Sequence, residues 1–345
     1  SRMGLVMLSA VLLAVWVCWS GFIAMRSTIW RSNYPRHLRA RVAGKLATIQ
    51  TLTASTLGLT LGAVMGDNLS RLDPSLSLES IGFEPLGVFR VYVVICVALG
   101  AVGVAILSTS DNTGPTINPM GVIRLLREDR RFGVYQINQF LMGMGNLMLM
   151  PLIPIILRER FGIDYFEGIL LASALPMLIT PMMIPVWSRL LDKVHIVKFR
   201  TVHSWVFVST ILALFAATMF EQRWLLYVAA ISQGAAMAGG MLAWQLGHHD
   251  FAPKERASEY MGVHVTLTGV RGLFGPVLAV SLYNALENYR DHSGAYVLVI
   301  CLSLVLAGAF GFLAMARKMD LTPVNDDGPA TSKTRGPAPL SKGGL

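Results

Sequence analysis

Long apolar runs separated by short polar stretches dominate the chain, and the runs recur at a nearly regular spacing. Each run holds about 20 residues, which at a helical rise of about 1.5 Å per residue is enough to cross a bilayer. The runs cover residues 3–25, 46–66, 88–108, 134–157, 168–187, 201–220, 224–246, 260–286 and 295–316. This pattern predicts an all-α membrane protein with nine transmembrane helices.

The composition supports a membrane environment. Hydrophobic residues make up 54% of the chain and charged residues only 14%, whereas a soluble domain has about 25% charged residues. This excess of hydrophobic over charged residues excludes a water-soluble fold, so we expect the protein to lie in a lipid bilayer. The C-terminal stretch 319–345 is different, because Pro, Gly, Ser, Thr and Lys dominate it. Such a stretch cannot bury a core and is predicted to be disordered.

The net charge of +9 indicates orientation in the membrane rather than nucleic-acid binding. Basic residues concentrate in the connections after the first, third, fifth and seventh runs and at the start of the tail. By the positive-inside rule these parts face the cytoplasm, which places the C-terminus inside and the N-terminus outside. No connection interleaves aromatic and basic residues as a base-stacking surface would, so no nucleic-acid partner is expected.

Two connections share a pattern that indicates an internal repeat. Pro35 and Gly44 recur as Pro253 and Gly262, each 218 residues later. Both connections lead into an apolar run with closely spaced glycines, which allow helix backbones to approach each other. The first three runs therefore correspond to the last three, and we expect three further helices upstream of Ser1. Parallel repeats of this kind are typical of transporters built from two halves.

The repeated stretches resemble motifs of the major facilitator superfamily. YPRHLRARVAG at 34–44 and APKERASEYMG at 252–262 are similar to the superfamily's loops after helices four and ten. TGVRGLFGP at 268–276 resembles its glycine–proline packing motif of helices five and eleven. SRLLDKVHIVKFR at 188–200 is a degenerate copy of its signature loop, which departs from the pattern at two expected glycines.

The resemblance implies a two-bundle architecture of six plus six helices, of which nine are visible. It divides the chain into a remnant of the N-terminal bundle (1–110, helices four to six), a central cytoplasmic linker with an amphipathic stretch (111–133), a C-terminal six-helix bundle (134–318) and the cytoplasmic tail (319–345). We expect an integral, multi-pass protein of a bacterial inner (plasma) membrane that works as a monomer.

The resemblance also implies that helices seven and ten line a central cavity. Polar side chains on the corresponding runs are candidates for substrate contact, because amides are costly in lipid and should face protein or water. The candidates are Gln136, Gln139, Asn146, Gln233, Met237 and Trp244, with Trp19 in the first run as a weaker one. The alternative is that these side chains only form hydrogen bonds between helices.

Arg271 is the basic residue that the pattern places deep inside a run. Central placement of arginine costs about 2.5–3.5 kcal/mol on insertion scales, so the side chain needs a partner. That partner is a carboxylate in upstream helices, backbone carbonyls near Gly272 and Pro276, or an anionic substrate. Arg271 is a further candidate for the cavity, and so is His264, which lies about two turns earlier on the same face. No Asp or Glu falls in the central part of any run, so the sequence shows no proton relay and leaves the coupling ion open.

Four polar residues are candidates for holding the cytoplasmic side closed: Arg39, Asp192, Lys193 and Arg200. All four are expected in cytoplasmic loops. Arg39 and Asp192 could form a charge contact between the two halves. The alternative is that these charges are solvated and only orient the protein in the membrane.

The predicted function is secondary active transport of a small molecule by alternating access, without cofactor, metal or catalytic residues. Two alternatives stay open. One is an integral membrane enzyme of acyl- or glycosyltransferase type, for which His248, His249 and Asp250 form the candidate cluster. The other is a sensor or scaffold with a transporter fold. A primary pump is not expected, because the chain has no GxxxxGK[ST] phosphate loop.

Overall fold

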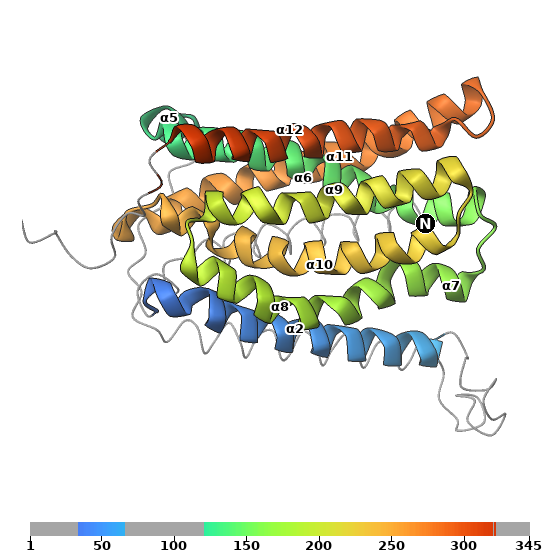
Figure 1. Cartoon of the computed structure of the whole chain (residues 1–345), viewed down its shortest axis with the longest axis horizontal. Helices are drawn as coiled ribbons and strands as arrows, with labels where there is room; N and C mark the ends of the chain where they lie inside the picture. Colours follow the sequence, from blue (N-terminus) through green and yellow to red (C-terminus); the bar gives the residue numbers. More distant parts are fainter. Residues whose placement is uncertain (1–33, 66–120, 320, 322–345) are drawn as a thin grey trace, which may run out of the picture.

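The computed structural model describes residues 34–65, 121–319 and 321, and these residues form helices joined by short connections (Figure 1). No strand occurs in these ranges. The elements are α2 (Arg36–Met65), α5 (Gly121–Glu128), α6 (Arg130–Glu159), α7 (Tyr165–Ile169), the π-helical turn η2 (Leu170–Ala174), α8 (Leu175–Lys193), α9 (Ile196–Phe220), α10 (Trp224–Leu246), the 3₁₀ turns η3 (Gly247–Asp250) and η4 (Lys254–Arg256), α11 (Ala257–Tyr289), η5 (Gly294–Tyr296) and α12 (Val297–Lys318).

Six helices between residues 130 and 318 are long and apolar enough to cross a membrane, which confirms the last six predicted spans. Helices α6 and α11 extend beyond their apolar runs at both ends, because polar residues continue the helix there. At the start of α6, for example, the Asp129 carboxylate accepts a hydrogen bond from the Phe132 N–H at 3.0 Å. Such a cap satisfies an N–H group that has no partner within the helix.

The polar stretch before the second apolar run is helical, contrary to the expected loop. Helix α2 begins at Arg36, so Arg39 and Lys45 lie in its first turns. Pro35 precedes the helix, and its carbonyl accepts from the Leu38 and Arg39 N–H groups at 3.1 Å. Hydropathy marks only the apolar part of such a helix and therefore misplaces its start.

The remaining N-terminal predictions lie outside the described residues. These are the runs at 3–25 and 88–108. Nearly all of the C-terminal tail also lies outside the described residues. The nine-helix count, the six-plus-six arrangement and the domain boundaries therefore stay predictions.

The long helices run roughly parallel to each other, with α2 along α8 at one side of the bundle and α12 at the opposite side (Figure 1). Helix α10 packs between α8 and α9, and α6 packs against both α11 and α12. Glycines bring α6 and α12 close together. A Cβ at Gly145 would lie 2.6 Å from the Cys301 carbonyl oxygen, and one at Gly308 would lie 2.7 Å from the Asn138 carbonyl oxygen. Small residues at helix contacts are typical of membrane bundles.

Candidate functional site

A cavity of about 340 Å³ opens among α2, α6, α9, α10 and α11. Its volume falls within the range of about 300–1,000 Å³ that is usual for small-molecule sites. The lining combines amides and two arginines with apolar and aromatic side chains: Gln50, Gln139, Met142, Gly143, Asn146, Leu147, Arg200, Phe207, Met237, Gly240, Met241, Trp244, Gln245, Thr268 and Arg271. This mixture of a few polar groups in an apolar wall is the usual character of a ligand site.

Five of the predicted cavity residues line this cavity, and three others do not. Gln139, Asn146, Met237, Trp244 and Arg271 all line this cavity. The three that do not are Gln136, Gln233 and His264, and Trp19 lies outside the described residues. Helices α6 and α10 both contribute to the wall, as the resemblance implies for helices seven and ten.

Arg271 projects from the middle of α11 toward α6 and is 5% exposed. Its Nη1 donates to the Gln139 carbonyl oxygen at 2.7 Å, and its Nη2 donates to Thr268 Oγ1 at 3.0 Å. Its Nε is buried without a hydrogen-bond partner in the described part of the chain. All of these acceptors are neutral. The carbonyl belongs to α6 and not to the backbone near Gly272 and Pro276, which was one of the three partners that the sequence left open.

A glycine makes room for this guanidinium. A Cβ placed on Gly143 of α6 would overlap the Nη1, Cζ and Nε atoms of Arg271. Since Gly143 also lines the cavity, the absent side chain lets the arginine lie flat against α6 at the cavity wall.

Thr268 connects Arg271 to an aromatic side chain. Its hydroxyl donates to the His264 carbonyl at 2.8 Å and accepts from both Arg271 Nη2 and Trp244 Nε1, the latter at 3.2 Å. One hydroxyl therefore orients a cation from α11 and an indole from α10.

Arg200 also faces the cavity, although the sequence placed it in a cytoplasmic loop. It lies in the second turn of α9 and is only 1% exposed. The predicted apolar run begins at residue 201, one position after Arg200. The chain therefore buries two arginines at the cavity, where the sequence indicated only Arg271.

A histidine holds Arg200 in place. His203 Nε2 lies 2.8 Å from the Ala236 carbonyl oxygen, so this nitrogen carries the proton. The opposite nitrogen, Nδ1, is then an acceptor and receives a hydrogen bond from Arg200 Nη1 at 3.2 Å. Trp187 stands edge-on to the imidazole with ring centroids 5.1 Å apart, and Phe199 stacks on it at 5.2 Å. The packing fixes the imidazole, and the imidazole orients the guanidinium.

Gln136 and His264 bond to each other and do not line the cavity. His264 Nδ1 donates to Gln136 Oε1 at 3.1 Å, and both side chains are at most 2% exposed. This is the interhelical hydrogen bond, between α6 and α11, that the sequence left open as the alternative to substrate contact.

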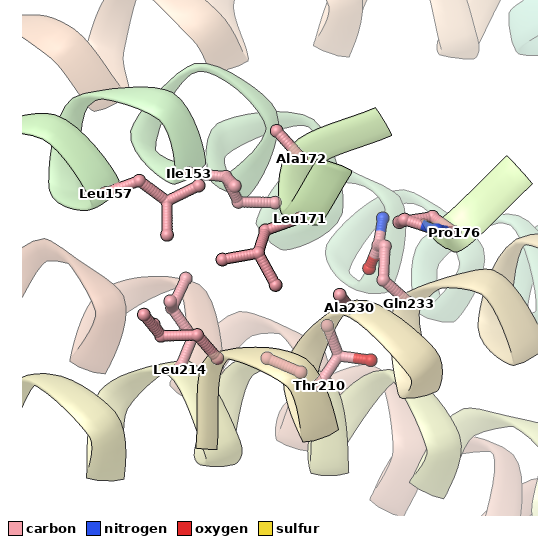
Figure 2. A pocket seen from close by; sticks show the side chains of 11 residues that line it. Ile153, Leu157, Leu171, Ala172, Pro176, Thr210, Leu214, Ala230 and Gln233 are labelled. Carbon is pink, nitrogen blue, oxygen red and sulfur yellow. The ribbon is translucent and has the colours of Figure 1, made fainter. Parts of the chain in front are cut away.

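Gln233 lies in a second, smaller pocket next to η2 and the start of α8 (Figure 2). The other lining side chains are apolar apart from Thr210. The Gln233 amide is 4% exposed, and neither its oxygen nor its nitrogen has a hydrogen-bond partner in the described ranges. The structure therefore separates Gln233 from Met237, although both lie on α10.

The gating candidates occupy three different environments. Asp192 Oδ1 accepts from the Ala40 N–H at 2.9 Å, which joins the end of α8 to the start of α2 across 152 positions of sequence. Arg39 is 4% exposed and donates to the Tyr34 carbonyl at 2.9 Å. Asp192 therefore binds the backbone of the second turn of α2, and the charge contact between Arg39 and Asp192 stays a prediction. Lys193 is exposed, and Arg200 faces the cavity.

The three residues considered as an enzyme's candidate cluster are buried, and one of them bonds to the backbone of a neighbouring helix. His248, His249 and Asp250 are 1–7% exposed, and Asp250 Oδ2 accepts from the Ile196 N–H at 2.6 Å at the start of α9. No group of three metal-binding side chains occurs in the part of the chain that the structure describes.

Sequence reasoning missed several lining residues. Thr268 stands three positions before Arg271, on the same helix face, and could have been found from that spacing. Gln245 follows Trp244 directly. Gln50 comes from α2, and no pattern indicates that this helix reaches the cavity.

Comparison with known families supports the resemblance. The sequence profile of the Major Facilitator Superfamily matches residues 2–276 and, in a second match, residues 135–343. No curated protein matches the chain. With six helices able to span a bilayer, the chain is an integral multi-pass membrane protein. It belongs to the Major Facilitator Superfamily of membrane transporters.

Proposed function

We propose that this protein is a secondary active transporter that moves a small molecule by alternating access, with the cavity between α6, α10 and α11 as its binding site. The observation that carries the proposal is the set of polar groups that converge on this cavity, chiefly the buried Arg271 and Gln139 and the half-buried Asn146. Midmembrane sites between helices of a rocking bundle are typical of such transporters.

The contact between α2 and α8 is the proposed closing surface on the cytoplasmic side. Gly44 of α2 packs against α8, where a Cβ would lie 3.0 Å from Ile184 Cγ2 and 3.3 Å from Ser188 Cβ. The Asp192 hydrogen bond to the Ala40 N–H lies one helical turn away. A tight backbone approach with one buried polar contact is an interface that two rigid halves can make and break.

Alternating access can be tested without knowing the substrate. In a background with Cys18, Cys96 and Cys301 replaced by serine, a cysteine at Met237 should react with a membrane-impermeant thiol reagent from either side of the membrane. A fixed cavity of an enzyme or scaffold would allow reaction from one side at most, and that result would contradict the proposal. A cysteine at Ile211, which is 1% exposed and does not line the cavity, is the matched control and should react from neither side.

The same background tests the proposed orientation. Lys198 is exposed near the start of α9, and a cysteine there should react only from the cytoplasmic side. Reaction from outside would reverse the orientation, including that of the C-terminus. Arg39 is unsuitable as a reporter, because the structure buries it.

A further inference from the structure

The cavity contains positive charge without negative charge. Arg200 and Arg271 both line it, and none of its described lining residues is Asp or Glu. Placing like charges together in a largely apolar wall is unfavourable unless a counter-charge joins them.

The contacts of both arginines leave this charge uncompensated within the described chain. Arg271 donates to a carbonyl and a hydroxyl, and Arg200 donates to a neutral imidazole nitrogen. Dipoles of this kind orient a guanidinium but do not neutralise it. Each arginine also keeps a buried Nε–H without a partner in the residues described. The side chains are therefore held in position with donor capacity left over, which is the arrangement expected of a preformed anion site.

The rest of the wall suits an apolar or aromatic body. Met142, Met237 and Met241 contribute flexible thioethers, and Phe207 and Trp244 contribute rings. Methionine side chains adapt to irregular ligand shapes and contact aromatic rings favourably. The indole of Trp244 is itself held by Thr268, beside the Arg271 guanidinium.

We infer that the transported substrate is a small organic anion, whose carboxylate or phosphate group is bound by Arg200 and Arg271 and whose apolar body lies against the methionines and Trp244. This inference rests on the proposed transport function and adds the chemical class of the substrate. It assigns binding to Arg200, which the sequence placed in a loop, and positioning to His203.

Ligand-dependent thermal stabilisation of the detergent-purified full chain tests the charge requirement. The probes are benzoate, phenyl phosphate, the neutral isostere benzamide and the cation benzylamine. We expect benzoate or phenyl phosphate to bind at least tenfold more tightly than benzamide, and the stronger of the two identifies the acidic group. Inorganic phosphate should stabilise less than phenyl phosphate, because it has no apolar body. Equal effects of benzamide or benzylamine, or no stabilisation by either organic anion, would overturn the inference.

Variants test whether the two arginines carry the effect. Arg200→Gln and Arg271→Gln should each weaken anion binding at least tenfold, whereas Arg189→Gln should change it less than twofold. Arg189 is the matched control, because it is exposed on α8 and does not line the cavity. If a glutamine variant does not fold, the corresponding lysine variant replaces it, with a smaller expected loss because lysine keeps the charge but not the two-pronged contact. Undiminished anion binding in the variants of both arginines would also overturn the inference.

A positioning role for His203 has its own readout. His203→Phe keeps the ring contacts with Trp187 and Phe199 but removes the acceptor for Arg200 Nη1. It should weaken anion binding severalfold without changing benzamide binding, whereas a merely structural role would lower both.

Uptake of radiolabelled benzoate or phenyl phosphate into proteoliposomes separates this inference from the transport proposal. Anion binding without uptake would keep the site and contradict transport. Cysteine reactivity from both sides without any preference for anions would keep transport and contradict the anionic substrate.

Discussion

Two groups of arginines in the C-terminal helices have opposite surroundings. Arg124 in α5 and Arg256 directly before α11 are paired with acids: Arg124 Nε lies 2.5 Å from Glu128 Oε1, and Arg256 Nε lies 2.6 Å from Glu259 Oε2. Their side chains are 80% and 41% exposed. Arg200 and Arg271 are 1% and 5% exposed and meet only neutral acceptors in the described structure.

This distribution is the reverse of what stability alone would favour. Exposed ion pairs contribute little because water and salt screen them, whereas a buried charge needs a partner to offset its desolvation. The carboxylates are paired with the exposed arginines, for which an ion pair contributes least to stability. The buried pair is therefore better explained by binding than by folding, and substitutions in the two groups should separate these roles.

The largest effect is expected at Arg271. Arg271→Ala should reduce uptake of the preferred labelled anion more than tenfold, while Arg271→Lys should retain part of it. Because the substitution removes a buried charge that no described acid offsets, the melting temperature of the purified protein should stay equal or rise. Arg189→Ala should change neither quantity. If Arg271→Ala lowers yield and melting temperature together with uptake, the side chain has a structural role instead.

A smaller effect is expected from substitution of Gly143, which would displace the Arg271 side chain without removing its charge. Gly143→Ala places a methyl group where the Arg271 guanidinium lies, so the arginine must move and uptake should fall severalfold. Gly272→Ala is the control, since a Cβ there meets no described atom within 4 Å. Alanine generally favours helix over glycine by about 0.5–1 kcal/mol, so a loss confined to Gly143→Ala reports displacement of Arg271. Equal uptake in both variants would contradict this role.

The sequence predicted the spans of these helices better than their rotation. Apolar runs report lipid contact directly, and the six described spans follow them. Gln136 and Gln139 differ by about 60° around a helix with 3.6 residues per turn, yet the first bonds to His264 and the second lines the cavity. A shared face read from spacing is too broad to distinguish a helix contact from a cavity wall.

Arg200 shows a second reason why the site was only partly predictable. A basic residue beside an apolar run has the same pattern whether it faces water or folds inward. What decides the matter is His203 on α9 and the Ala236 carbonyl on α10, which fix an acceptor next to the guanidinium. Arg200 and His203 are only three positions apart on α9, but the Ala236 carbonyl that fixes the imidazole comes from the next helix, and the local pattern of the chain does not show that contact.

An intermediate effect on stability is expected at the junction of α8 and α2. Asp192→Ala removes the acceptor of the Ala40 N–H in the second turn of α2 and should cost about 0.5–1.5 kcal/mol, the usual net contribution of an intramolecular hydrogen bond. This corresponds to a decrease of a few degrees in melting temperature. Asp192→Asn keeps an acceptor oxygen and should lose less. If both variants melt like the parent, the contact contributes nothing to stability, and its proposed role in closure loses its support.

The smallest effect is expected in the exposed group. Arg256→Gln should leave uptake unchanged and lower the melting temperature by no more than about 2 °C, since exposed pairs contribute little. A loss of uptake comparable to that of Arg271→Ala would end the distinction between the two groups of arginines.

The small loss of melting temperature in Arg256→Gln should depend on pH, because the exposed arginines are paired with a titratable carboxylate. The hydrogen bond from Arg124, with a further contribution from Arg256, lowers the pKa of the Glu128 carboxyl. A lowered carboxyl pKa stabilises the folded state above the unfolded value of about 4.3, and this stabilisation is lost as the pH falls through the folded value. The difference in melting temperature between the parent and Arg256→Gln should therefore be constant from about pH 6 to 8, shrink below the unfolded value of about 4.3, and vanish only below the lowered folded value. Salt at about 1 M should shrink it at neutral pH, because exposed charges are screened. A difference that persists in acid or in high salt would show that Arg256 acts through packing rather than through its charge.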